Sequence, residues 1–213
     1  MKWWITVLPI VLIALVLNFR KSNSTVNPNF QGNGIVLKTF QNYYESVKLA
    51  CKEYPKIPES YILALIGLEC SGRKIVPHRF ENHIYAQLKK VKKGQKRYFE
   101  NIVQKDLMGK NERELRELAS SWGPFQIMGY KSIAMNIDLD GLDNQDRIIN
   151  GISWISENYG IYLEQGKYQD AFHLHNTGKP YPKIGKPFTF RNNYVSDGLS
   201  LMDSFQNLIL QIQ

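Results

Sequence analysis

The side chain of Glu69 is the strongest candidate for acid chemistry in this sequence of 213 residues. It ends the run YILALIGLE, in which every residue from Ile62 to Leu68 is apolar or glycine. A carboxyl group at the end of such a helix is expected to be desolvated, and desolvation favours its protonated form. A carboxyl group that stays protonated near neutral pH is what a general acid in glycosidic-bond cleavage requires. A glutamate that turns from the helix end into solvent is the alternative that this stretch leaves open.

Glu81, within the sequence RFENH, is the best candidate for a second carboxylate, one that would position a water molecule. Arg79 lies two residues earlier, so a structural ion pair between these two side chains is the alternative. His173 and His175 form an H-x-H pair, but a zinc site needs at least three protein ligands and no third is evident. We therefore expect neither a metal site nor an organic cofactor.

The stretch ELASSWGPFQIMGY, residues 117–130, combines a tryptophan, a Gly-Pro pair and a glutamine with apolar residues. Glycine and proline each weaken a helix interior, so a plain core helix does not explain this mixture. The mixture indicates a segment that is shaped around something other than a simple core.

The composition of the chain limits its size class and its partners. The sequence is 43% hydrophobic and 22% charged, which is typical of one well-buried domain with a short appendage. Its formal net charge of +8 favours an anionic partner such as nucleic acid, anionic lipid or bacterial wall polymer. The basic run 88–97 belongs to no recognisable nucleic-acid-binding module, so no nucleic-acid partner is expected. Cys51 and Cys70 are too few for a disulfide framework, and a single bridge between them stays open.

The N-terminus carries an apolar run, residues 3–17, with Lys2 before it and Arg20 and Lys21 after it. As a helix this run would extend ~22 Å, which is short of the ~30 Å hydrocarbon core of a bilayer. The length suits a signal-peptide core, whereas the lack of a good cleavage site favours retention as a membrane anchor. The positive-inside tendency weighs Arg20 and Lys21 against Lys2 and would hold the C-terminal part inside, so the topology stays open.

The chain divides into three regions: a signal peptide or membrane anchor at 1–22, a linker at 23–34 rich in Asn, Ser, Pro and Gly, and one mainly α-helical domain at 35–213. Apolar residues recur at helical spacing over most of the third region, and alternating strand patterns are few. The expected helical segments are 36–51, 58–72, 112–119, 144–160, 170–178 and 197–213.

Three short segments resemble, in order and spacing, the motifs of the lysozyme-like superfamily that includes goose-type lysozymes and lytic transglycosylases. LECSG resembles its catalytic turn, SWGPFQIM its Gly-x-x-Gln-Ile/Val-Met segment, and AFHLHNTGKP its Ala-x-x-x-Tyr-Asn-x-Gly motif. The resemblance covers about residues 60 to 180. PHRFENHIY, before the second motif, is similar to the N-acetylmuramidase family of bacterial and phage wall-degrading proteins.

This resemblance implies a lysozyme-like, mainly α-helical domain with a cleft, which cleaves the β-1,4 bond between N-acetylmuramic acid and N-acetylglucosamine in peptidoglycan. Glu69 would protonate the glycosidic oxygen, and either water or the sugar's own 6-hydroxyl would complete the reaction. Gly123 would allow close approach of the backbone to a sugar, and residues 126–128 would continue into a helix along the cleft. Trp122 would either offer its face to a sugar ring or lie buried. The implied substrate-binding residues are Ser121, Trp122, Gly123, Gln126, Met128, Tyr130, His175 and Asn176.

Two positions depart from the family pattern, because Cys70 stands where Ser is usual and His175 replaces the usual Tyr. These departures leave open whether the products are those of a hydrolase or of a transglycosylase. A wall-binding or secretion-assembly protein that keeps the cleft without turnover is the alternative function. Since peptidoglycan lies outside the cytoplasmic membrane, we expect export to the periplasm or to the outer face of that membrane, with membrane association through residues 3–17.

Overall fold

The computed structural model describes residues 32–212. The predicted signal peptide or anchor at 1–22 and residues 23–31 of the predicted linker lie outside the described residues. Helix α2 (Gly32–Cys51) begins inside the predicted linker, so the last three residues of that linker are helical. Glycine has a low helix propensity, which is why the sequence indicated a later start. Packing of α2 against α3 and α9 outweighs that preference.

The described residues form a mainly helical structure, as the sequence predicted. The helices are α2 (Gly32–Cys51), α3 (Glu59–Cys70), α4 (Asn82–Lys92), α5 (Glu112–Leu118), α6 (Lys131–Met135), α7 (Arg147–Glu164), α8 (Tyr168–Thr177) and α9 (Tyr194–Leu210), with 3-10 turns at η1 (Gln104–Leu107) and η2 (Leu139–Leu142). Within residues 32–212, no helix combines the length and the hydropathy that crossing a bilayer requires.

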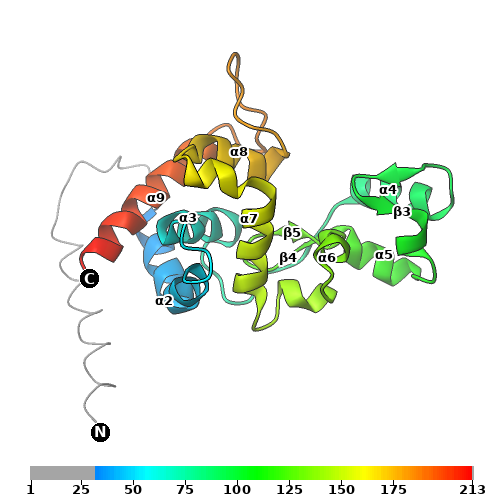
Figure 1. The fold of residues 1–213 in the computed structure, drawn as a ribbon, viewed down its shortest axis with the longest axis horizontal. Helices are drawn as coiled ribbons and strands as arrows, with labels where there is room; N and C mark the ends of the chain where they lie inside the picture. Colours follow the sequence, from blue (N-terminus) through cyan, green and yellow to red (C-terminus); the bar gives the residue numbers. More distant parts are fainter. Residues whose placement is uncertain (1–31, 213) are drawn as a thin grey trace, which may run out of the picture.

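Helix α3 is the centre of a large lobe that also contains α2, α7, α8 and α9 (Figure 1). Every side chain from Tyr61 to Ile66 is fully buried, because α3 has no polar face and is packed between α2 and α9. Moving such a helix out of its place would expose apolar surface to water. The C-terminal end of α3, which carries Glu69, is therefore held in a fixed position.

A small lobe has its own apolar core, separate from that of the large lobe (Figure 1). It contains α4, α5 and the hairpin of β2 (Tyr98–Phe99) and β3 (Ile102–Val103). The basic run 88–97 is partly helical, because Leu88 and Val91 of α4 are fully buried in this core. Its lysines at 89, 90 and 92 form the last turn of α4, where the helix dipole favours positive charge.

A three-stranded antiparallel sheet lies between the lobes, in the strand order β1 (Arg79–Phe80), β4 (Ser120–Trp122), β5 (Ile127–Met128). Arg79 pairs with Ser121, and Ser121 pairs in turn with Met128. The prediction that residues 126–128 continue into a helix is therefore wrong. The backbone turns back at Gly123, which has a φ of +64°, and Ile127 then pairs with Trp122. A glycine at positive φ favours such a turn.

Candidate active site

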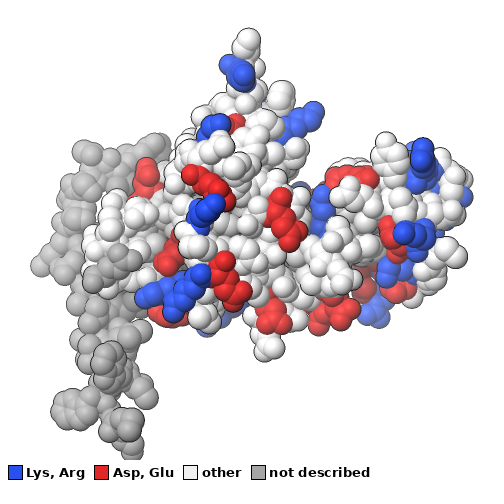
Figure 2. All heavy atoms as spheres, viewed as in Figure 1, with Lys and Arg blue, Asp and Glu red and all other residues white. Residues whose placement is uncertain are grey.

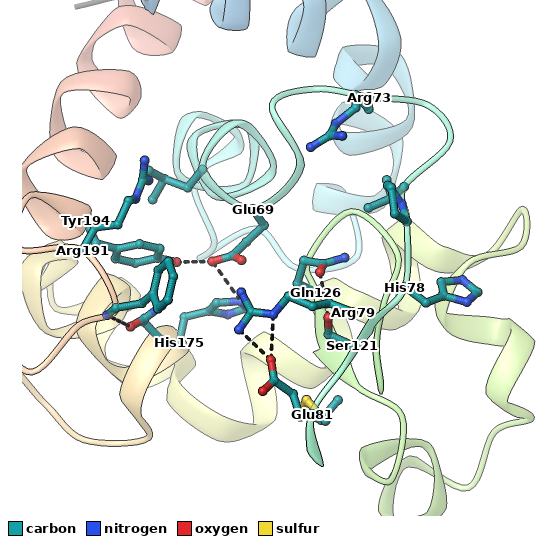
Figure 3. Close-up of a pocket in the computed structure, with 16 residues that line it drawn as sticks. Glu69, Arg73, His78, Arg79, Glu81, Ser121, Gln126, His175, Arg191 and Tyr194 are labelled. Carbon is teal, nitrogen blue, oxygen red and sulfur yellow. Dashed lines mark hydrogen bonds and ion pairs between the residues drawn. The ribbon is translucent and has the colours of Figure 1, made fainter. Parts of the chain in front are cut away.

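A cavity of about 520 Å³ opens where the end of α3, the segment before α4, the β4–β5 hairpin, the end of α8 and the start of α9 meet (Figure 3). Seven of the ten residues that the sequence predicted as catalytic or substrate-binding line this cavity: Glu69, Glu81, Ser121, Gln126, Met128, His175 and Asn176. They come from four separate segments of the chain. The fold therefore brings the two candidate carboxylates and most of the candidate polar groups to one place.

Glu69 faces this cavity from the last turn of α3, with its side chain 15% exposed. The Tyr194 hydroxyl donates a hydrogen bond to Glu69 Oε1, and His175 Nε2 lies 3.9 Å from the same oxygen (Figure 3). Among the residues that the structure describes, no Lys or Arg nitrogen lies within 4.0 Å of the Glu69 carboxylate. The hydrogen-bond partner of Glu69 is thus a hydroxyl, and its nearest nitrogen-bearing neighbour is an imidazole rather than a Lys or Arg side chain.

The imidazole of His175 is fixed on both sides. Its Nε2 lies 2.9 Å from the Phe125 carbonyl oxygen, which can only accept, so Nε2 carries the proton. Its Nδ1 then accepts from the Tyr159 hydroxyl at 2.7 Å. Burial lowers the pKa of His175, against the smaller opposing effects of Glu69 and the Phe125 carbonyl. His175 is therefore neutral near neutral pH, and its Nε2–H donates to the Phe125 carbonyl while Nε2 lies 3.9 Å from Glu69 Oε1.

Tyr194 is the most important residue of the site that the sequence did not identify. It is the first residue of α9, lies 125 positions from Glu69, and is 3% exposed. Burial raises the pKa of its hydroxyl well above the ordinary value, so this group stays a proton donor in its bond to Glu69. Nothing in the local sequence distinguishes Tyr194 from a core tyrosine on an amphipathic helix.

Glu81 has a different environment from Glu69. The Arg79 guanidinium donates from Nε to Glu81 Oε1 at 2.7 Å and has a second nitrogen 2.6 Å from the same oxygen (Figure 3). His83 Nδ1 lies 3.6 Å from Oε2. Glu81 thus forms the ion pair with Arg79 that the sequence offered as an alternative, and it also lines the cavity.

The β4–β5 hairpin contributes an amide that is already oriented. The Ser121 hydroxyl donates to Gln126 Oε1 at 2.7 Å, and Gln126 Nε2 donates to the Gly123 carbonyl at 3.1 Å. Gln126 itself has a φ of +50°, an unusual backbone conformation for a residue with a side chain. These bonds hold Gln126 at the cavity wall, with hydrogen-bonding capacity left on its amide and on the Ser121 hydroxyl.

Trp122 does not line the cavity, in contrast to its predicted contact with substrate. Its Nε1 donates to the Glu117 carbonyl at 2.8 Å, and its ring packs on that of His78 with centroids 3.6 Å apart. His78 does line the cavity, so Trp122 supports a wall residue from behind.

Gly123 and Tyr130 also lie outside the cavity wall. A Cβ at Gly123 would stand 1.9 Å from the Leu142 carbonyl oxygen, so the close approach that this glycine allows is to the protein's own backbone and not to a sugar. Tyr130 is 3% exposed and packs in the core of the small lobe, with its ring edge-on to Phe99. Both predicted substrate contacts are therefore corrected to structural roles.

The histidines of the H-x-H pair have separate surroundings. His173 is fully buried and its Nδ1 donates to the Lys179 carbonyl at 2.7 Å, while His175 faces Glu69. Within residues 32–212, no group of three or more His, Cys, Asp or Glu side chains is arranged to hold a metal ion.

The two cysteines are free thiols and both are buried. Burial raises the pKa of the Cys51 thiol to about 12 and also raises that of Cys70. Cys70 Sγ donates back to the Ile66 carbonyl at 3.3 Å, and the residue is 1% exposed. The Ser-to-Cys departure beside Glu69 therefore changes a core position rather than the cavity wall.

Comparison with protein-family models, curated proteins and solved structures gives no match for this chain.

Proposed function

We propose that this chain cleaves the β-1,4 bond between N-acetylmuramic acid and N-acetylglucosamine in peptidoglycan, in a lysozyme-like domain with Glu69 as the general acid. The observation that carries the proposal is the setting of Glu69. It stands at the end of a buried helix, faces a polar cavity, and accepts a hydrogen bond from the Tyr194 hydroxyl. A second carboxylate, Glu81, lines the same cavity and is paired with a cation. Two carboxyl groups in contrasting environments are typical of glycoside cleavage. The resemblance of three ordered motifs supports the same reaction.

In the proposed reaction, Glu69 transfers its proton to the glycosidic oxygen while the bond from that oxygen to the anomeric carbon breaks. The carboxylate left on Glu69 accepts the hydrogen bond of Tyr194, and the His175 imidazole lies 3.9 Å from the same oxygen. Donors aimed at a charge that develops during the reaction stabilise the transition state more than the ground state.

The second half of the reaction returns a proton to Glu69. In hydrolysis, water oriented by Glu81 attacks the anomeric carbon and transfers one proton to the Glu69 carboxylate. In transglycosylation, the sugar's 6-hydroxyl attacks instead, and its proton goes to the Glu69 carboxylate. The polar groups of Ser121, Gln126 and Asn176 would bond sugar hydroxyl and N-acetyl groups.

Replacement of the acid tests the proposal directly. Glu69→Gln keeps the size of the side chain and the ability to accept from Tyr194, but it cannot supply the proton. We expect a loss of roughly 10²–10⁴-fold in the rate of glycan-strand cleavage. Binding to purified peptidoglycan and the melting temperature should be retained.

Glu164→Gln is the matched control, because Glu164 forms only an exposed ion pair with Lys56 outside the cavity. Its rate should equal that of the unmodified protein. An unchanged rate in Glu69→Gln would end the assignment of the acid. An unmodified protein that binds peptidoglycan without cleaving it would instead identify the alternative, a wall-binding or secretion-assembly protein that keeps the cleft.

The proposed substrate also sets the location of the protein. Peptidoglycan lies outside the cytoplasmic membrane, so we propose export to the periplasm or to the outer face of that membrane, directed by residues 3–17. Cell fractionation followed by sequencing of the mature N-terminus separates a cleaved signal peptide from a retained anchor. A full-length product found only in the cytosol would contradict both versions.

A further inference from the structure

The loop between α8 and α9, residues 179–193, projects from the large lobe as the most prominent extension in the view of Figure 1. It carries four basic residues and no acidic residue, and so has a formal charge of +4: Lys179, Lys183, Lys186 and Arg191. Figure 2 shows basic and uncharged atoms on its projecting tip, without acidic atoms on this face. The loop as a whole is therefore strongly basic.

The same loop exposes apolar side chains. Ile184 is 92% exposed, Phe188 70% and Phe190 80%. These three fall within seven consecutive residues, although only nine large hydrophobic side chains are exposed in the described part of the chain. Phe190 lines the cavity and packs against the Arg79 guanidinium, and one edge-to-face contact joins Phe188 to the His173 ring. Most of the Phe188 side chain and nearly all of the Ile184 side chain remain open to solvent. Apolar groups that gather in one exposed place mark a site of interaction.

Hydrogen bonds to the large lobe hold both ends of the loop in place. The buried imidazole of His173 donates from Nδ1 to the Lys179 carbonyl and accepts at Nε2 from the Phe188 N–H, at 2.7 and 3.3 Å. Tyr181 N–H donates to Asp170 Oδ1 at 2.9 Å. Proline residues at 182 and 187 flank the tip and restrict its backbone. A loop that is already ordered loses little entropy when it binds.

We propose that this loop docks on an anionic phospholipid bilayer, with Ile184 and Phe188 in the interfacial region and Lys179, Lys183 and Lys186 against the lipid headgroups. Basic residues near an anionic leaflet and apolar side chains at the headgroup boundary each favour binding. A polyanionic wall polymer would satisfy the lysines but offers no apolar phase to the exposed Ile and Phe. The inference does not depend on the proposed cleavage reaction. Since Phe190 and Arg191 line the cavity, docking would hold the cavity close to the membrane surface.

The test uses the full chain with a reporter on the loop, so that any attachment through residues 3–17 does not produce the signal. Ile184→Cys is labelled with a polarity-sensitive fluorophore, while Cys51 and Cys70 are buried and stay unlabelled in the folded protein. Met108→Cys, at a 72% exposed position just before α5, carries the same label as the matched control.

Vesicles of phosphatidylglycerol and phosphatidylcholine should shift the emission of the Ile184 label to the blue, and brominated lipids should quench it. Vesicles of phosphatidylcholine alone should give a weak shift, and the Met108 label should respond to neither. Adding Lys183→Gln and Lys186→Gln should lower the ratio of docked to free loop by about fivefold per lysine, or about 30-fold together. The same emission shift from the Ile184 and Met108 labels in anionic vesicles would overturn the proposal. A shift produced by purified peptidoglycan, and not by vesicles, would assign the loop to the wall polymer instead.

Discussion

Tyr194→Phe isolates the contribution of one hydroxyl group to the proposed reaction. The substitution removes the donor to Glu69 Oε1 and keeps the ring, which is 3% exposed and packed in the large-lobe core. In the proposed mechanism this hydroxyl stabilises the Glu69 carboxylate once the proton has left. A hydrogen bond to a charged group contributes about 1.5–3 kcal/mol, which corresponds to a rate loss of roughly 10- to 150-fold.

The stability of the protein should change far less than its rate. The net contribution of one neutral hydrogen bond to folding is about 0.5–1.5 kcal/mol, which for a chain of this size lowers Tm by at most about 6 °C. The cavity beside Glu69 is open to water, which can replace part of the lost bond. Tyr194→Phe should therefore remain fully folded at the assay temperature.

The assay measures the release of soluble fragments from purified peptidoglycan, together with a thermal melt of each variant. Tyr85→Phe is the control, because it removes a hydroxyl that donates to the Glu112 carboxylate on the small lobe, outside the cavity. It should retain the original rate. A Tyr194→Phe protein that works at the original rate would refute the argument, as would a loss of rate that only tracks the loss of folded protein.

Three further predictions follow from the same geometry. Glu81→Gln should lower the hydrolytic rate by about 10²-fold. Tm should change by less than about 4 °C, because the half-exposed ion pair with Arg79 stabilises folding by at most about 1 kcal/mol. A large fall in Tm with a proportionate fall in activity would show that the pair is purely structural. Burial lowers the pKa of His175 in the folded state, so the unfolded chain binds a proton more readily and the free energy of unfolding should decline as pH falls below about 6.5. Calorimetry should show a weaker dependence of stability on pH in His175→Gln, and an unchanged dependence would contradict this prediction. Gly123→Ala would place a Cβ 1.9 Å from the Leu142 carbonyl oxygen at a φ of +64°, and should destabilise the fold by at least about 2 kcal/mol; a Tm within about 2 °C of the original would show that the β4–β5 turn is placed wrongly.

Much of the candidate site can be predicted, because several of its side chains stand in short segments that each have an unusual local sequence. Glu69 interrupts an apolar run at a helix end, and Gln126 stands beside a Gly-Pro turn. Local pattern identifies such residues, and an apolar stretch as uniform as α3 also predicts its own burial. The mainly helical fold followed from the same periodicity.

The local sequence pattern does not show which residue from a distant part of the chain a given side chain will contact. Tyr194 has the spacing of a core residue, and only the packing of α9 against α3 brings its hydroxyl to Glu69. Gly123 was interpreted as making room for a sugar, yet the atom that needs the room is the Leu142 carbonyl. The strand at Ile127 was missed because two residues of pairing leave no periodic signal, and its partner strand fixes it.

Mass spectrometry of the products from purified peptidoglycan tests the central claim most directly. The account predicts fragments with new ends at N-acetylmuramic acid, either reducing ends from hydrolysis or 1,6-anhydro ends, which differ by one water. These ends should appear with the unmodified protein and with Glu164→Gln, and should be almost absent with Glu69→Gln. Glycan strands left intact by the unmodified protein, or new ends that appear equally with Glu69→Gln, would contradict the account.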